Sequence, residues 1–252
     1  MAKQWHQLER LDHKSLKKLQ QEREKAVLTQ KADADRKRVA IIGGVVVGVI
    51  VCLAIFLVIL RNRAAERAFK EERELLLVTN VSDVNGKVVG KSLGDWESID
   101  KGLKFREEYT FKTEKEGFIV VELQRKNMLK LLPESEMLVK PPELDPKENR
   151  VVKEFAELNR GEVTVSIALD GRELLEVEAG GVVALGASGL YKVLYNNTKR
   201  TGEVVVKNGL VEVFSRRSPQ KRVKVSGFYK VTFQDGQIAN PTQASVIQYD
   251  WR

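Results

Sequence analysis

Residues 39–60 read VAIIGGVVVGVIVCLAIFLVIL, an apolar stretch of 22 residues without a charged side chain. A helix rises about 1.5 Å per residue, so this stretch would extend roughly 33 Å and cross the hydrocarbon core of a bilayer. A cleavable signal peptide has a shorter apolar region, about 7–15 residues, after a short basic start. Here the leader, residues 1–38, is long and highly charged. The sequence therefore predicts one permanent membrane-spanning helix.

Basic residues on both sides of this span bear on its orientation. The leader contains eleven Lys or Arg residues and six acids, and three of the basic residues, Arg36 to Arg38, adjoin the span. The far flank is basic as well, with Arg61 and Arg63. Basic residues near a span favour the cytoplasm. We expect the N-terminus to be cytoplasmic and residues 61–252 to be exported.

The leader is predicted to be a basic helical tail. Apolar residues recur roughly at helical spacing between residues 5 and 30, among many charges. One interpretation is a solvated or membrane-surface helix, attracted to anionic lipid by its net charge of +5. The other is a helix that docks on a cytoplasmic partner or on its twin, through Trp5, Leu8, Leu11 and Leu19. The leader has no recognisable nucleic-acid-binding motif, so no nucleic acid is expected as a partner.

Gly44 and Gly48 form a G-x-x-x-G pattern inside the span. Small residues four apart let two membrane helices approach closely, so these two glycines are candidates for homodimerisation. After the span, residues 61–74 are rich in Ala, Arg and Glu, which are good helix formers. They are predicted to form a helical stalk next to the membrane.

The character of the sequence changes at Leu75, where short β-rich runs begin to alternate with turn signals. These features predict a mainly β domain at residues 75–239 and a C-terminal tail at 240–252. Asn-Gly and Asp-Gly between apolar runs are strong hairpin signals. The predicted turns are Asp170-Gly171, Asn196-Asn197, Asn208-Gly209 and Asp235-Gly236, with Asn208-Gly209 the clearest. The Pro-rich residues 141–150 are expected to be an exposed loop that divides the domain.

The exported part contains neither His nor Cys, which excludes most enzyme chemistry. The two histidines lie in the leader, and the only cysteine is Cys52 in the span. No Ser-His or Cys-His nucleophile and no ordinary zinc site can therefore form outside the membrane. Phosphate-binding and dinucleotide-binding glycine motifs are absent as well. We expect no enzyme activity, no catalytic residue, no metal and no cofactor.

Four blocks of the β region resemble the FecR domain of bacterial envelope proteins. Residues 117–139 resemble two alternating strands followed by a Pro-x-Ser step at Pro133 to Ser135. Leu158, Gly161 and Val163 are similar to the family's Leu-x-x-Gly-x-Val strand entry. Residues 188–193 and 201–214 follow in the family's order. The resemblance implies a stack of short strands, either solenoid-like or a sandwich, and a place in the bacterial inner membrane with the β domain in the periplasm.

Two functions are compatible with this resemblance. Iron-signalling members of the family have a long cytoplasmic anti-sigma region and an additional exported subdomain, whereas the leader here has 38 residues and little follows residue 239. We therefore expect a structural adaptor or scaffold whose β domain binds a protein partner in the cell envelope. The alternative is a single-pass regulator that passes an exported binding event to a cytoplasmic partner, in which case helix pairing at Gly44 and Gly48 would be central.

Overall fold

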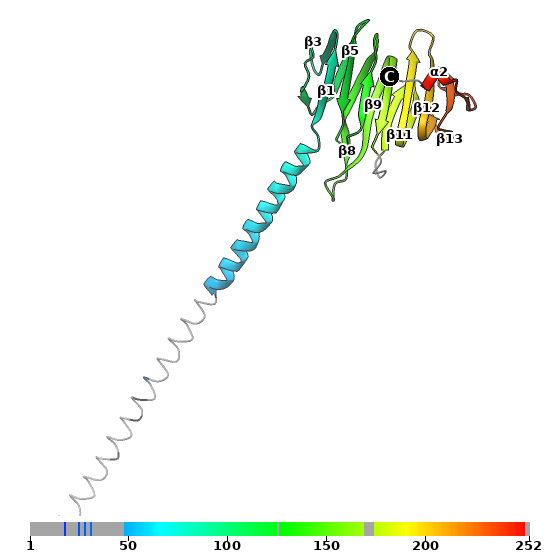
Figure 1. Ribbon diagram of the computed structural model, residues 1–252. Helices are drawn as coiled ribbons and strands as arrows, with labels where there is room; N and C mark the ends of the chain where they lie inside the picture. Colours follow the sequence, from blue (N-terminus) through cyan, green and yellow to red (C-terminus); the bar gives the residue numbers. More distant parts are fainter. Residues whose placement is uncertain are drawn as a thin grey trace, which may run out of the picture. The chain divides into compact units, whose positions relative to one another are not determined.

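The computed structural model describes residues 48–124, 126–168 and 174–249, together with Lys18, Lys25, Leu28 and Lys31. The chain divides into two compact units, residues 1–67 and 68–252. One long apolar helix is followed by a large mixed β-sheet domain, which confirms the predicted fold class (Figure 1).

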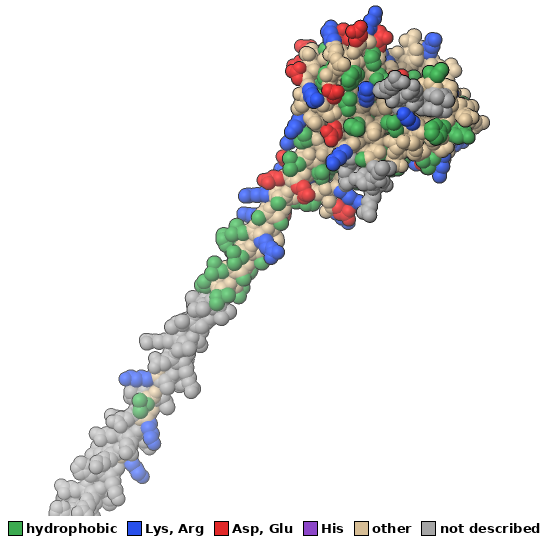
Figure 2. Space-filling model, viewed as in Figure 1, with side chains coloured by type: hydrophobic (Ala, Val, Ile, Leu, Met, Phe, Trp, Pro, Cys, Tyr) green, Lys and Arg blue, Asp and Glu red, His purple; other side chains and the backbone are tan. Residues whose placement is uncertain are grey.

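The helix runs without a break over Gly48–Leu75 and is long and apolar enough to cross a membrane. Figure 2 shows hydrophobic side chains over its beginning and charged ones farther along. Its large apolar residues between Val49 and Leu60 are 44–63% exposed. The first β-rich run expected from Leu75 does not begin as a strand, because the helix continues through Leu75 and a turn follows, in which Val78 N donates to Leu75 O at 3.2 Å.

The β domain is one continuous sheet that folds over on itself into two layers. The first layer has the strand order β3-β2-β5-β8-β9-β10-β11-β12-β13. Its strands are β3 Glu97–Ser98, β2 Val88–Lys91, β5 Tyr109–Thr113, β8 Glu136–Leu144, β9 Val151–Ile167, β10 Leu174–Ala179, β11 Val182–Asn196, β12 Thr201–Ser215 and β13 Ser218–Ser226. All these pairs are antiparallel except β9 with β10, which are parallel.

The second layer has the order β4-β1-β6-β7-β9-β11-β12-β14, with β15 and β16 along the outer side of β14. The strands not yet given are β4 Lys104–Phe105, β1 Thr79–Asn85, β6 Phe118–Glu122, β7 Met128–Leu131, β14 Tyr229–Gln234, β15 Gln237–Ile238 and β16 Thr242–Gln243. The short helix α2, Val246–Tyr249, ends the described chain.

Three long strands, β9, β11 and β12, belong to both layers. The first part of β9 pairs with β8 and β10, and from Gly161 onward β9 pairs with β11. The first part of β11 pairs with β10 and its second part with β9. In the same way β12 pairs with β14 through Val205 and with β13 from Leu210. The two-layer sandwich, one of the two arrangements that the sequence left open, is therefore joined by strands that cross between layers.

The core lies between the layers and is filled by alternate residues of nearly every strand. Buried side chains come from the first layer, such as Phe111 and Met137, and from the second, such as Ile119 and Val193. The alternation of buried and partly exposed residues along β9 shows this clearly. Tyr191 is fully buried; its hydroxyl has no hydrogen-bond partner within the described residues, and burial raises its pKa.

The corner of β9 depends on a close approach between Gly161 and Ser135. Gly161 has φ of +92°, and a Cβ there would lie 2.6 Å from the Ser135 Cα. The Ser135 hydroxyl accepts a hydrogen bond from Glu162 N at 2.9 Å and donates one to Pro133 O at 3.0 Å. The structure therefore joins two of the FecR-like blocks, the Pro-x-Ser step and the strand entry that contains Gly161.

One further sequence prediction is wrong, and another is only partly right. Asn208-Gly209 is not a hairpin turn, because β12 continues through it. Gly209 lies opposite Gly189, both have positive φ, and a Cβ on either would come within 2.3 Å of a carbonyl oxygen on the other strand. The pair lets β11 and β12 bend together. The expected loop at residues 141–150 is shorter than predicted, because β8 extends to Leu144.

Two of the other predicted turns are confirmed. Asn196-Asn197 joins β11 to β12, and Asp235-Gly236 joins β14 to β15 with positive φ at both residues. Asp170-Gly171 lies outside the described residues. In the predicted C-terminal tail, residues 240–252, the structure has the short strand β16 and helix α2.

Replacing Gly161 with Ala should destabilise the β domain by about 3 kcal/mol, because the added methyl group meets the Ser135 backbone and the left-handed conformation is strained. Gly102→Ala is the matched control: its φ of +89° is nearly the same, but nothing lies within 4 Å of the added Cβ. It should cost only about 1 kcal/mol. Denaturant unfolding followed by tryptophan fluorescence measures both, and equal losses would contradict the role given to Ser135.

Candidate functional site

The surface of the first layer that faces away from the core, over β9 to β13, is called the outer face here. Side chains alternate along these strands, so Leu175 and Val177 point into the core while Glu176 and Glu178 point outward. The outer face carries a small apolar cluster of its own, Val183, Leu185 and Phe214, at most 9% exposed. Neighbouring side chains therefore cover these three residues, and this part of the outer face is shielded from solvent.

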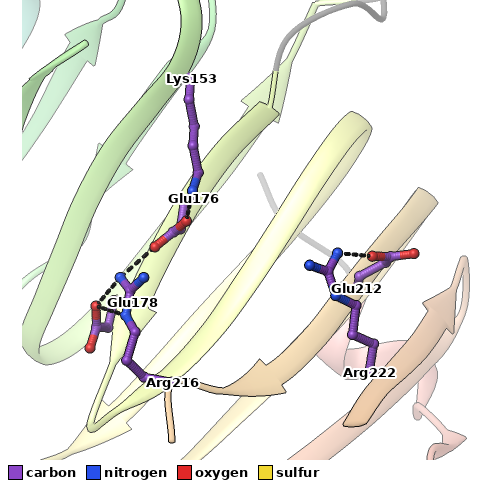
Figure 3. Close-up of polar contacts among 6 residues, drawn as sticks. All are labelled: Lys153, Glu176, Glu178, Glu212, Arg216 and Arg222. Atoms are coloured by element: carbon purple, nitrogen blue, oxygen red, sulfur yellow. Dashed lines mark hydrogen bonds and ion pairs between the residues drawn. The ribbon is translucent and has the colours of Figure 1, made fainter. Parts of the chain in front are cut away.

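Glu176 is the most deeply buried charge on this face, with 2% of its side chain exposed. Figure 3 shows it between two cations, Lys153 from β9 and Arg216 from the turn after β12. The Arg216 Nη2 lies 2.5 Å from Glu176 Oε1, and the Lys153 ammonium contacts the other carboxylate oxygen. A buried carboxylate held by two cations is neutralised in place, which is a structural role.

Arg216 connects strands that are not neighbours. Its backbone N donates to Gly181 O at 2.9 Å, and its guanidinium pairs with both Glu176 and Glu178 on β10. Because β11 lies between β10 and β12 in the sheet, this side chain spans β11. The hydrogen bond to Glu178 raises the pKa of Arg216. The pairs fasten the turn before β13 to the middle of the layer.

A second set of ion pairs lies toward β13. Arg222 Nη1 is 2.7 Å from Glu212 Oε2, and Lys224 Nζ is 4.0 Å from the other oxygen of the same carboxylate (Figure 3 shows the first pair). The Arg222 guanidinium also lies 4.7 Å from the centre of the Phe214 ring. One carboxylate here faces two cations, so β13 keeps an excess of positive charge.

An open groove of about 1200 Å³ lies at one end of the second layer. Tyr195 and Phe233 line it as a stacked pair with ring centres 6.2 Å apart. Three of its carboxylates are already in ion pairs, listed here with their partners: Glu162 with Lys192, Glu203 with Lys230, and Asp235 with Arg200. Glycoside hydrolysis needs two free acids, and of the four carboxylates that line the groove only Glu134 is outside an ion pair within the described residues.

The loop after β8 holds the end of the long helix. Asn149 Nδ2 donates to Phe69 O at 2.7 Å and to Glu72 Oε2 at 3.3 Å. Arg106 adds an exposed ion pair to Glu74 at 3.8 Å. The loop itself is shaped by Asp145, whose Oδ1 accepts hydrogen bonds from Lys147 N and Glu148 N at 2.8 and 3.1 Å. These backbone donors, Lys147 first, lower the pKa of Asp145.

The predicted site residues can now be placed. Gly48 begins the described helix, and a Cβ there would meet open space. Gly44, Trp5, Leu8, Leu11 and Leu19 lie outside the described residues, so helix pairing and cytoplasmic docking stay predictions. Within the described chain, no group of three or more His, Cys, Asp or Glu side chains could hold a metal ion.

Sequence reasoning missed Arg216, Asn149 and the exposed edge of β13. The basic run between Arg216 and Lys224 was the available signal for β13. For Arg216 and Asn149 there was none, because their partners lie 40 and up to 80 residues away in the chain.

Comparisons with known proteins give a distant likeness only. No family model and no curated protein matches the chain. Two crystal structures from Parabacteroides distasonis ATCC 8503 are similar, each described as "a putative anti-sigma factor". They are 16% and 15% identical to this chain, with TM-scores of 0.45 and 0.44. The alignments cover 55% and 54% of this chain, and only 61% and 60% of the two relatives.

Replacing Glu176 with Gln should lower the free energy of unfolding by about 3 kcal/mol, because two cations lose their buried partner. Glu178→Gln removes the same charge from a side chain that is 22% exposed and should cost about 1 kcal/mol or less. Chemical denaturation of both variants in the same detergent is the measurement. A loss for Glu178→Gln as large as for Glu176→Gln would contradict the assignment of the buried charge to Glu176.

The loop that holds the helix should open in acid. The folded-state pKa of Asp145 is lowered. The ionised carboxylate therefore stabilises the folded loop fully above the ordinary pKa of 3.8, and this stabilisation is lost as the pH falls through the lowered pKa. We expect the amide NMR signals of Lys147 and Glu148 to shift only below that value. In Asp145→Asn, which keeps the acceptor oxygen, this acid step should be absent. Hydrogen exchange at Phe69–Leu75 should rise in Asn149→Ala and stay unchanged in Asp145→Asn.

Proposed function

We propose that the chain is a single-pass, non-enzymatic protein of the bacterial inner membrane whose exported β domain binds a protein partner as an adaptor or scaffold of an envelope assembly. The observation that carries the proposal is the attachment of the helix end to a β domain whose deeply buried Glu176 is held by two cations. Asn149 holds the last turns of the helix, and buried Glu176 is locked between two cations. A domain built in this way positions a surface rather than performs chemistry.

The proposal keeps the domain boundaries that were expected from the sequence. Residues 1–38 are a cytoplasmic basic tail, 39–60 the membrane span, 61–74 the stalk, 75–239 the β domain and 240–252 the tail. Eleven basic residues in the leader support the orientation with the N-terminus inside. The four FecR-like blocks support a periplasmic β domain. Pairing of two chains through Gly44 and Gly48 would place two β domains in one assembly.

A transmembrane regulator is the second candidate, and one contact favours it. Because Asn149 and Arg106 hold the helix through Phe69, Glu72 and Glu74, a change in the loop after β8 would reach the helix directly. The scaffold needs this contact only for rigidity, whereas the regulator needs it to differ between two states.

Single-cysteine labelling tests the orientation. The natural cysteine, Cys52, is removed as Cys52→Ser, and Ser15→Cys or Ser92→Cys is added in turn. Ser92 is exposed on the β domain, so an impermeant maleimide should label its cysteine in intact spheroplasts. The cysteine at position 15 should react only after the cells are lysed. The opposite pattern would refute the proposed topology.

Deletion of residues 2–30 separates the two candidates, because it leaves the basic residues next to the span in place. A scaffold should still copurify with the same envelope partners after crosslinking. A regulator should lose a transcriptional output while its β domain stays exported. Loss of all crosslinked envelope partners from the intact chain would refute both.

A further inference from the structure

Strand β13 is an exception among the edges of the two layers. At the other edges the outermost strands are two residues long: β3 beside β2, β4 beside β1, and β15 and β16 beside β14. β13 has nine residues and, within the described part of the chain, pairs only with β12. Figure 1 shows it at the margin of the domain opposite β3. It is the one long edge that no described strand covers.

An uncovered edge presents a row of backbone N–H and C=O groups that another strand can pair with. Natural proteins discourage such pairing by shortening the edge strand or by placing Lys and Pro on it. β13 has not been shortened, but it carries Pro219, Lys221 and Lys224. Positive charges discourage strands that are neutral or positive, and they attract strands that are negative.

The charge near β13 is an excess that the domain does not neutralise. Residues 216–226 contain five Lys or Arg residues and no acid. Of these, Arg216 is held by Glu176 and Glu178, and Arg222 and Lys224 share Glu212. No ion pair within the described residues neutralises Arg217 or Lys221, and both are exposed. An approaching acidic segment would meet at least three cations without a full partner.

The two faces of β13 also specify the pattern of an added strand. Val225 is buried and Val223 is half-buried against the core, while Arg222 and Lys224 face outward. Directly opposite residues on neighbouring strands share a face. An added strand would therefore place apolar residues beside the two valines and acidic residues beside the two cations. The matching segment alternates Asp or Glu with β-branched residues.

We propose that β13 is the docking site for an extended acidic segment of a partner protein, which joins the first layer as a further strand. The inference rests on the proposed adaptor function, which requires a protein partner. A second copy is a poor occupant, because β13 against β13 would bring like charges together. Nucleic acid and anionic lipid would meet the same cations but have no backbone that could pair with the edge.

Selection from a random library of twelve-residue peptides tests the proposal. The full chain is held in phosphatidylcholine nanodiscs, and the affinities of the selected peptides are measured by fluorescence anisotropy. We expect acidic peptides with alternating β-branched residues to be enriched. Hydrogen exchange with a bound peptide should slow at Ser218–Ser226.

Charge variants provide a matched comparison. Arg217→Glu with Lys221→Glu should weaken the selected peptides by about tenfold or more. Lys115→Glu with Lys199→Glu changes the net charge equally at exposed residues away from β13 and should leave affinity within about twofold. Peptides N-methylated at alternate residues separate backbone pairing from charge: one of the two alternate sets should lose binding.

Several results would overturn the proposal. These are enrichment of no acidic alternating peptides, equal binding of both N-methylated sets, or competition by an oligonucleotide or by phosphatidylglycerol vesicles as strong as by the peptide. Protection of another strand would also overturn the assignment to β13 but leave partner binding by the β domain intact. The proposed function itself fails on separate results, an inverted labelling pattern or the absence of envelope partners.

Discussion

The close approach of Gly161 to Ser135 is the constraint on which the β domain depends. At that point β9 leaves one layer and enters the other, and a side chain on Gly161 would occupy the position of the serine. The serine hydroxyl takes part in the corner by accepting a hydrogen bond from Glu162 N. The close approach of Gly189 to Gly209 allows the equivalent bend in β11 and β12. Without these bends, three long strands could not serve both layers, and the core between them would not close.

Charge is distributed over this framework in two ways. On the outer face Glu176 is neutralised by Lys153 and Arg216, so the middle of the first layer is locked. Toward β13 the balance changes, because Glu212 has two cations beside it. Buried ion pairs contribute little to net stability compared with apolar residues, but breaking one is costly. The ion pairs therefore hold the middle of the layer together and leave positive charge without a full partner along β13.

The β domain also holds the end of the long helix. The loop after β8 lies between the eighth and ninth strands, yet Asn149 reaches back to Phe69 and Glu72. Asp145 Oδ1 accepts hydrogen bonds from the backbone amides of Lys147 and Glu148, and these bonds hold the loop in its conformation. Contacts that hold the last turns of the helix suit the proposed adaptor, which has to present its surface to a partner without losing binding energy to disorder.

Composition and local periodicity are enough to predict the apolar helix and the mainly β class, and the absence of His and Cys from residues 61–252 can be read directly from the sequence. It also marked the turns at Asn196-Asn197 and Asp235-Gly236, whose residues accept the required backbone angles locally. Asn208-Gly209 carried the same local signal and was misjudged, because only the strand opposite, with Gly189, shows that the glycine serves a bend. The sheet order, the burial of Glu176 and the bare edge of β13 depend on residues tens of positions apart. These features are seen only in the folded chain, since contacts between distant segments leave no periodic trace in the sequence.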